Sequence, residues 1–473
     1  MLHLTSLNIL FSVFKMLSKQ PLIQMSAAEA LGLTVLTVAA MGTAIIAWGW
    51  VPQLAIIAAV IALMVYGMAR GARWSDMQKR MAASVEQGMG AIYLFFFIGL
   101  LVSALMMSGA IPTLMYYGFG LISPDYFYLS AFLLCALIGV SIGSSLTTCA
   151  TVGAAFMGMA EAFHAAPAVT AGAVVSGAFF GDKMSPLSDT TAIAAQTVGV
   201  DLFEHIKNMA YTTLPALVLT AAALLWLVPD TAPDTLNRAA ALRDQLAASG
   251  LVHGYALLPF VLLVVLAVLK VNANLAMIWT VLLSLGMTFL HSSPDLAQLG
   301  GWFFGGFKAE HAGEGIAKLV SRGGIESMFF TQTVVILALS LGGLLFALGV
   351  VPVLLDAMRR FLISAGRATL SAAMTAVGIN FLIGEQYLSI LLAAETFKPV
   401  YEKLGLHPRN LSRTLEDAGT VINPLVPWSV CGVFIANVLG VAVWDYLPFA
   451  FFCYLSLILT LLFGFTGLTL SKK

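Results

Sequence analysis

The chain has 473 residues, of which 60% are apolar and only 10% are charged. Soluble globular proteins carry roughly 25% charged residues, so this composition, with a mean hydropathy of +0.95, indicates a polytopic helical membrane protein. The formal net charge is zero, with 23 Lys and Arg against 23 Asp and Glu, and it gives no reason to expect a nucleic-acid partner.

In chain order, the first predicted element is a cytoplasmic or interfacial lead, residues 1–26, whose apolar stretch is too short to cross roughly 30 Å of hydrocarbon. Ten apolar runs follow, at 28–49, 52–69, 90–108, 166–200, 209–229, 255–270, 274–290, 328–349, 411–440 and 443–468. Two more stretches, 126–162 and 368–400, are broken at GSSLTT and GEQYLS, as re-entrant hairpins are. The predicted fold is therefore an all-α polytopic membrane protein with about ten transmembrane helices.

The two halves of the chain share landmarks in the same order. Gly109-Ala-Ile-Pro112 recurs as Gly349-Val-Val-Pro352, and IGSS at 142–145 recurs as IGEQ at 383–386. SPLSDT at 185–190 then corresponds to NPLVPW at 423–428. An odd number of crossings in each half would invert the second copy relative to the first, as in many secondary transporters. We expect a first repeat at 27–229, an extracytoplasmic linker at 230–253 and a second repeat at 254–468, each with a re-entrant hairpin and a broken helix.

The distribution of Lys and Arg favours a multi-pass protein of the cell (inner) membrane with both termini in the cytoplasm. In that orientation the cytoplasmic segments carry Lys15, Lys19, Arg70, Arg73, Lys79, Arg80, Lys207, Lys270, Arg359, Arg360, Arg367, Lys398, Lys403, Arg409, Arg413, Lys472 and Lys473. The outer segments keep Arg238, Arg243, Lys308, Lys318 and Arg322.

The broken span at 166–200 carries Asp182, Lys183 and Asp189 within eight positions. Ionisable side chains inside membrane spans are costly and by default mark a pathway or a site. Gly181 and Pro186 favour unwinding of the helix here. The freed carbonyls, a carboxylate and the hydroxyls of Ser185, Ser188, Thr190 and Thr191 make the oxygen-rich environment that a small cation prefers. The alternative is that Lys183 pairs with an aspartate and the motif only breaks the helix.

The first hairpin tip offers four hydroxyls, those of Ser144, Ser145, Thr147 and Thr148, and the repeat is expected to bring them close to the broken span. Hydroxyl clusters in membrane helices also serve helix packing, which is the competing interpretation.

The second half has carboxyl groups at the equivalent places. Glu385 lies at the second hairpin tip, in apolar surroundings that favour the neutral acid and would suit a proton carrier. The second broken span is marked by Glu416, Asp417, Asn423, Pro424 and Pro427. In the competing interpretation, Glu416 and Asp417 are a solvated helix start beside Arg409 and Arg413.

Two strings carry a family resemblance, GAFFGDKMSPLSDTT at 177–191 and LEDAGTVINPLVPWSVCG at 415–432. On these the sequence resembles the NhaC family of Na+/H+ antiporters, from about residue 27 to residue 466. The resemblance implies a sodium-coupled exchanger with two inverted repeats. Relatives include Na+/H+ exchangers, a malate/lactate exchanger and amino-acid carriers, so the substrate stays open. The stretch AIAAQ after SDTT departs from the family pattern.

We expect Na+/H+ exchange by alternating access, with Asp189 binding Na+ when ionised and a proton when neutral. The residues expected to help bind the ion are Asp182, Ser185, Ser188, Thr190, Ser145, Thr147 and Thr148. Glu385, Asp417 and Asn423 would form the second proton-linked group or line the path, and Lys183, Pro186, Pro424 and Pro427 would support the motifs. The alternatives are a Na+-coupled carrier of a small organic anion or amino acid, and a passive cation channel.

No nucleotide-binding loop, HExxH motif or serine-protease arrangement is present in the sequence, so neither an enzyme nor a cofactor is expected. The four cysteines lie singly in apolar surroundings and are predicted to be packing residues. The expected partners are the lipid bilayer, Na+ and H+, with a small carboxylate or amino acid under the alternative; a homodimer is left open.

Overall fold

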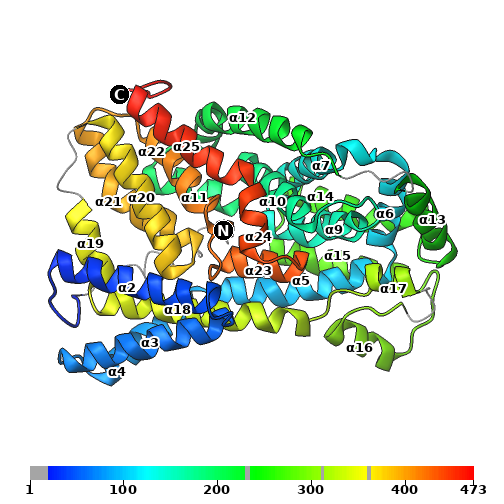
Figure 1. Cartoon of the computed structure of the whole chain (residues 1–473), viewed down its shortest axis with the longest axis horizontal. Helices are drawn as coiled ribbons and strands as arrows, with labels where there is room; N and C mark the ends of the chain where they lie inside the picture. The colour runs from blue at the N-terminus through cyan, green and yellow to red at the C-terminus, as the bar shows by residue number, and fades with distance from the viewer. Residues whose placement is uncertain (1–19, 230–234, 310–313, 359–363, 473) are drawn as a thin grey trace. The chain divides into compact units, whose positions relative to one another are not determined.

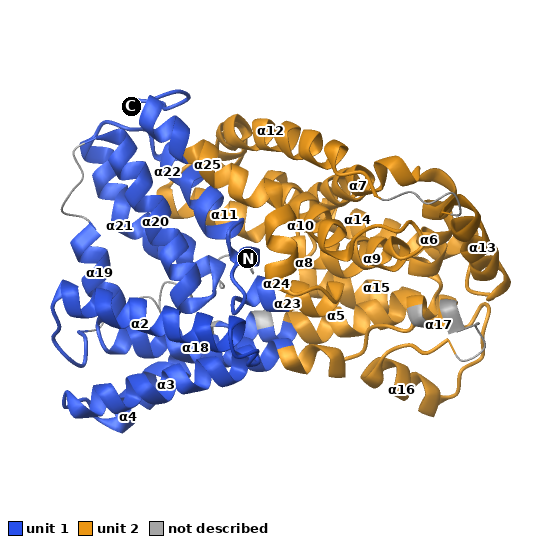
Figure 2. Cartoon of the chain, viewed as in Figure 1, with its two compact units in different colours: residues 1–93, 331–433, 461–473 blue, residues 94–330, 434–460 orange. Residues whose placement is uncertain are grey.

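The computed structural model describes residues 20–229, 235–309, 314–358 and 364–472. Helices make up the regular structure of these ranges, apart from one isolated bridge between Leu406 and Lys472 (Figure 1). Most of the predicted lead 1–26 falls outside them, as do Lys15, Lys19, Arg359, Arg360 and Lys473. The chain divides into two compact units, 1–93, 331–433 and 461–473 as unit 1, and 94–330 and 434–460 as unit 2 (Figure 2).

Unit 1 contains the second predicted hairpin and most of the second broken span. Its helices are α2 (Ala27–Ile46), α3 (Pro52–Ala69), α4 (Trp74–Gln87), α19 (Val350–Met358), α20 (Ala365–Ile383), α21 (Gln386–Lys403) and α22 (Pro408–Leu415), followed by the π-helical turn η5 (Glu416–Thr420) and the 3-10 turn η6 (Asn423–Leu425). Helices α20, α21 and α22 pack against one another and against η5 (Figure 1).

Unit 2 contains the first hairpin and the first broken span. Its helices are α6 (Ala110–Leu121), α7 (Phe127–Ile142), α8 (Ser145–Thr148), α9 (Ala154–Ala160), α10 (Pro167–Met184), α11 (Asp189–Val198), α12 (Leu202–Trp226), α13 (Thr235–Ala248), α14 (Leu258–Val268), α15 (Ala273–Thr288), α16 (Leu296–Gly305), α17 (Glu314–Val320) and α24 (Val443–Tyr446). Four further helices have residues in both units: α5 (Met89–Met107), α18 (Glu326–Ala347), α23 (Val430–Leu439) and α25 (Phe451–Thr466).

The apolar helices confirm a polytopic membrane protein. Six of the described helices are long and apolar enough to cross a membrane, and nine spans result if each of three bent pairs counts as one. The predicted count of about ten included 255–270 and 274–290, which fold as shorter helices, α14 and α15. The first arms of both predicted hairpins belong to the long group, since Pro124–Ile142 and Ala365–Ile383 pass the same test.

The landmarks of the sequence repeat have matching backbone conformations. Gly109 and Gly349 both have positive φ at the break after a long helix, and Gly143 and Gly384 both end a hairpin arm in the left-handed conformation. Glycine adopts this conformation at little cost, which explains its use at these turns. The repeat boundaries at 27–229 and 254–468 stay a prediction, and the two compact units divide the chain differently, each taking segments from both halves.

Close glycine contacts bring α10 onto α7 in unit 2. A Cβ atom on Gly181 would lie 2.5 Å from Gly139 Cα, and one on Gly177 would lie 2.2 Å from the carbonyl oxygen of Phe132. These glycines therefore let the two backbones approach, as small residues do between membrane helices. The end of α10 is thereby held beside the hairpin tip that follows α7.

Candidate functional site

The best-defined polar contact of the predicted site joins Asp182, near the end of α10, to Ser145 at the first hairpin tip. The Asp182 Oδ2 atom accepts hydrogen bonds from the backbone N–H of Ser145 at 3.2 Å and from its hydroxyl at 2.7 Å. Both side chains are buried. The contact confirms the expected proximity of the hairpin tip to the first broken span.

Local sequence explains why the Ser145 N–H points at a carboxylate. Gly143 ends α7 with positive φ, which turns the chain sharply. Ser144 then caps the next helix, and its side chain accepts from the N–H of Thr147 at 3.3 Å. The N–H of Ser145, in the first turn of that helix, has no carbonyl of its own helix to bind and donates to Asp182 instead.

The hydroxyls of Thr147 and Thr148 bind the hairpin itself. Thr148 Oγ1 donates to the carbonyl of Ser144 at 2.8 Å, and Thr147 Oγ1 lies 3.0 Å from Ser144 Oγ. Both side chains are buried. Their contacts fit the packing interpretation of the cluster, with Ser145 as the member that reaches the carboxylate.

The chain between α10 and α11 is held by serine and threonine side chains. Ser188 caps α11, forms a side-chain hydrogen bond with Asp182, and lies 3.0 Å from Thr190 Oγ1. Ser185 Oγ accepts from the N–H of Leu187 at 3.2 Å, which stabilises the break itself. Asp182 is therefore surrounded by hydroxyl groups from both sides of the break, an environment that can hold a proton or a hard cation.

The three charges of the motif differ in burial. Asp189, in the first turn of α11, is exposed, and its negative charge acts on Asp182. Lys183 is wholly buried, with its ammonium 5.7 Å from the centroid of the Phe452 ring. Its charge also acts on the buried imidazole of His205. Pro186 is exposed in the break.

The second hairpin tip has a carboxylate where the first has a serine. Glu385 caps α21, accepting from the N–H of Leu388 at 2.8 Å, as Ser144 caps α8. The side chain is 8% exposed. Gly384, which precedes it, accepts from the N–H of Val430 at 2.8 Å, so the second hairpin tip also contacts its broken span.

Asn423 and Asn380 form a buried amide pair in the second broken span. Asn423 Nδ2 donates to Asn380 Oδ1 at 2.8 Å and to the carbonyl of Gly384 at 3.2 Å. Asn423 Oδ1 accepts from the N–H of Cys431 at 3.0 Å, while Asn380 Nδ2 donates to the carbonyl of Gly419 at 2.7 Å. The sequence pointed to Asn423 but missed Asn380. The only signal for Asn380 was its place four residues before Gly384, where Gly139 stands before Gly143 in the first half.

Glu416 and Asp417 are not a solvated helix start, which corrects one of the interpretations drawn from the sequence. Both are wholly buried, within the π-helical turn η5. Arg413 is buried too and donates from Nη1 to Thr469 Oγ1 at 2.9 Å. Arg409 is partly buried and donates from Nε to Ser471 Oγ at 3.0 Å. Pro424, within η6, and Pro427, after it, are also buried.

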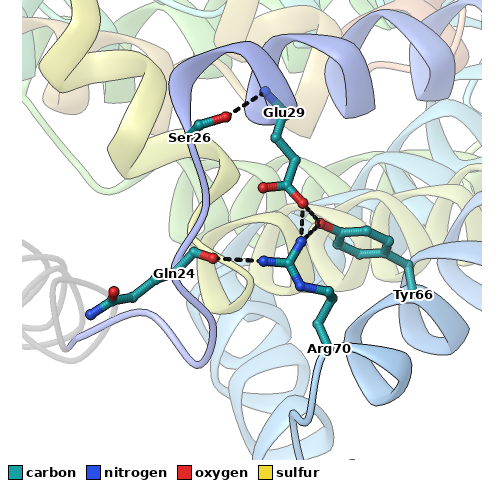
Figure 3. Close-up of polar contacts among 5 residues, drawn as sticks. All are labelled: Gln24, Ser26, Glu29, Tyr66 and Arg70. Carbon is teal, nitrogen blue, oxygen red and sulfur yellow. Dashed lines mark hydrogen bonds and ion pairs between the residues drawn. The ribbon is translucent and has the colours of Figure 1, made fainter.

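A further polar cluster, which the sequence did not suggest, joins α2 to α3. Glu29 accepts from the side chains of Tyr66 and Arg70, and Arg70 Nη2 donates to the carbonyl of Gln24 at 3.0 Å (Figure 3). Arg70 and Glu29 are partly exposed. Exposed ion pairs contribute little to stability, so we assign the cluster the role of orienting the two helices.

The remaining sequence expectations concern metals and cysteines. Within the described ranges, no three His, Cys, Asp or Glu side chains group as a metal site would require. All four cysteines are buried, and the thiol of Cys431 contacts Gln386 Oε1 at 3.7 Å. The main chemical features of the described residues are the carboxylate of Asp182 among hydroxyls in unit 2 and the buried carboxyl groups of Glu385, Glu416 and Asp417 in unit 1.

Comparisons with known proteins match most of the chain. A model of the Na+/H+ antiporter family matches residues 1–192 and 177–468. The Na(+)/H(+) antiporter NhaC of Alkalihalophilus pseudofirmus is 40% identical over 426 residues, covering 89% of this chain and 92% of the relative. NhaC of Bacillus subtilis is 36% identical over 421 residues, covering 88% and 92%. The Malate-2H(+)/Na(+)-lactate antiporter of Bacillus subtilis is 32% identical over 425 residues, covering 88% and 89%.

Proposed function

We propose that this chain, which belongs to the Na+/H+ antiporter family, exchanges Na+ for H+ across a membrane by alternating access. Membership of this family confirms the resemblance that the two broken-span motifs indicated. The apolar helices show that the chain is a multi-pass membrane protein. The observation that carries the proposal is the buried carboxylate of Asp182 among the hydroxyls of Ser145 and Ser188.

Asp182 holds Na+ when it is ionised and a proton when it is neutral. Keeping a buried carboxylate ionised is costly, so the empty, ionised site is the unfavourable state during a change of access. Either ion removes that cost, but one carboxylate cannot carry both at once. Competition for Asp182 therefore makes the exchange obligatory.

In this proposal Asp189 lies at the entrance of the site, and Asp182 binds the ion inside it. The sequence alone favours it as the main Na+ ligand, but its side chain is exposed whereas that of Asp182 is buried and hydrogen-bonded. An exposed charge is screened by water and binds an ion weakly. Asp189 thus attracts the cation to the entrance of the site, and Ser188 and Thr190 supply oxygen atoms between the two carboxylates.

The other predicted residues hold the site or complete the path. Ser185, Thr147 and Thr148 fix the backbone around Asp182, and Lys183 and Pro186 maintain the break. In the second half, Glu385 and Asp417 serve as proton-linked groups, while Asn423, Pro424 and Pro427 shape the second break. By the distribution of Lys and Arg, the chain lies in the cell (inner) membrane with both termini in the cytoplasm.

A second candidate function is Na+-coupled transport of a small organic anion or amino acid. It is favoured by the relative named Malate-2H(+)/Na(+)-lactate antiporter. Thermal unfolding of the purified protein with Na+, Li+, malate, lactate or amino acids separates the two, because a ligand that binds the folded state raises the melting temperature. Stabilisation by Na+ and Li+ alone supports Na+/H+ exchange, and stabilisation that requires an organic compound supports the second candidate.

A further inference from the structure

The span formed by α5 and α6 is bent by 63° where the two helices meet, within unit 2. Gly109, at the bend, has a φ of +77°. A Cβ atom on this glycine would lie 2.0 Å from the carbonyl oxygen of Leu251, in the segment 249–257 that follows α13. The backbone of this segment therefore packs directly against the bend, at a place where only glycine leaves room for it.

Two histidines contact the two arms of the bend. The N–H of His253 donates to Thr113 Oγ1, in the first turn of α6, at 3.1 Å. The Thr113 hydroxyl in turn lies 3.4 Å from the carbonyl oxygen of His253. On the other arm, His291 Nε2 lies 3.1 Å from the carbonyl oxygen of Met107, the last residue of α5. Segment 249–257 and the end of α15 are thus both attached to the bend.

The side chains of these two histidines are also in contact with each other. The centroids of the His253 and His291 rings are 4.8 Å apart. The ring of Tyr255 stacks on that of His253 at 4.9 Å, and its hydroxyl lies 3.4 Å from His291 Nδ1. Both imidazoles are partly exposed, so protons can reach them from water.

The contacts of His291 suit a neutral ring. A carbonyl oxygen only accepts, so His291 Nε2 carries a hydrogen and donates it to Met107. Nδ1 of the neutral ring then accepts from the Tyr255 hydroxyl, and a second proton on Nδ1 removes that acceptor. Burial, with a contribution from the charge of His253, lowers the pKa of His291. The structure with the two histidines in contact therefore favours the unprotonated pair.

The surrounding elements offer little to offset the charge of a protonated pair. Helices α6 and α14 pack against the short helix η3 (Gly254–Leu257), and α14 packs against α15. Neither these elements nor α5 contain Asp, Glu, Lys or Arg. The charged residues on the adjoining segments are Arg238, Arg243 and Asp244 on α13 and Asp295 before α16. Arg243 lies on the ring of Tyr116, and Asp295 caps α16.

Helix α6 links the bend to the first hairpin. It packs against α9, and a Cβ atom on Gly118 of α6 would lie 2.6 Å from Met159 Sδ on α9. Helix α9 is part of the second arm of the hairpin whose tip carries Ser145, the partner of Asp182. A change in the position of α6 can therefore be transmitted to the proposed transport site.

We propose that His253 and His291 form a proton-binding site outside the transport site, and that its protonation releases residues 249–257 from the bend and slows exchange. The two positive rings repel each other, and the bond from Tyr255 to His291 is lost. The inference goes beyond the proposed function, because this site regulates the exchanger and carries no transported ion.

The test is hydrogen–deuterium exchange of residues 249–257 in the purified full-length protein, from about pH 8 to about pH 5, across the titration range of histidine. Protection is expressed relative to an unstructured peptide at the same pH, so that it reports local opening. We expect wild-type protection to fall roughly tenfold on acidification, within the range typical of coupling between two sites.

His291→Gln keeps a donor for the carbonyl of Met107 but takes up no proton, so its protection is expected to stay constant over this range. His164→Gln is the matched control, because His164 is an exposed histidine between α9 and α10. Its protection should fall as that of wild type does. If His291→Gln does not fold, the same comparison with His253→Gln decides.

Wild-type protection that does not change with pH, or an equal fall in wild type and His291→Gln, overturns the inference. Transport is the second measurement, in which Na+ uptake into proteoliposomes should slow more on acidification in wild type than in His291→Gln. Equal slowing in the two overturns the regulatory role. Wild-type proteoliposomes that do not exchange Na+ for H+ overturn the proposed function instead, and the protection measurement then decides whether the proton site exists.

Discussion

The carboxylate of Asp182 accepts both the backbone N–H and the hydroxyl of Ser145, at 3.2 and 2.7 Å. The two residues are 37 positions apart in the sequence and join the end of α10 to the first hairpin tip. In the proposed exchange, the binding or release of Na+ or a proton at Asp182 acts on the hairpin through this contact.

Ser145→Ala removes the hydroxyl and keeps the backbone donor. Hydrogen bonds to charged groups contribute about 1.5–3 kcal/mol, so we expect the half-saturating Na+ concentration for transport to rise roughly tenfold or more. Ser141→Ala on α7 is the control, because that hydroxyl donates to the carbonyl of Leu137 in its own helix. Equal Na+ dependence in the two variants would remove Ser145 from the site.

Gly177→Ala tests the close approach of α10 to α7. The added Cβ would lie 2.2 Å from the Phe132 carbonyl, and overpacking of this kind costs about 1–3 kcal/mol. The melting temperature is expected to fall, as measured by thermal unfolding in detergent. Gly286→Ala on α15 is the control, since its new Cβ would meet no atom within 4 Å beyond its own stretch of helix in the described part of the chain. A melting temperature like that of the control would contradict the packing argument.

Asn380→Ala tests the amide pair of unit 1. It removes one partner of Asn423 and the side-chain hydrogen bonds to the carbonyls of Ala418 and Gly419. Each buried group that is left unsatisfied costs about 1–3 kcal/mol. We expect a marked loss of melting temperature and of transport. The exposed Gln78→Ala on α4 should leave both unchanged. Wild-type stability of Asn380→Ala would show that the pair is dispensable.

Acidification should destabilise the protein through His291, which lies beyond the end of α15. Burial, with a contribution from the nearby charge of His253, lowers the pKa of His291 in the folded state. The unfolded chain then binds the proton more tightly, so stability is lost as the pH falls through the unfolded value of about 6.5.

The measurement is the melting temperature as a function of pH. His291→Gln keeps an amide donor for the carbonyl of Met107, which His291 Nε2 contacts at 3.1 Å. We expect a smaller loss of melting temperature on acidification in this variant than in wild type. Identical pH profiles would rule out His291 as a source of the acid sensitivity.

Much of the fold could be predicted because its signals are local. Gly109 and Gly349, with Gly143 and Gly384, mark the turns of two related halves, and their conformations match as the sequence pattern implied. Apolar length identified most of the spans. Two of the runs, at 255–270 and 274–290, form helices that are shorter than the other spans.

Which of the two aspartates is the buried one could not be predicted in the same way. Asp182 and Asp189 are equally acidic in sequence, and only tertiary packing buries the first and exposes the second. The sequence leaves open whether Glu416 is buried or part of a solvated helix start, because its burial depends on contacts from α20 and α21. Asn380 had no signal beyond its place four residues before Gly384, because its partners lie 38 to 43 residues further along the chain.

The most direct test of the central claim is uptake of radioactive sodium into proteoliposomes that hold an acidic interior, with wild type, Asp182→Asn and Asp189→Asn compared at equal protein content. We predict saturable uptake by wild type that stops when the pH gradient is collapsed, no uptake by Asp182→Asn, and uptake with weaker Na+ dependence by Asp189→Asn. Wild-type uptake by Asp182→Asn, or none by the wild-type protein, would contradict the account.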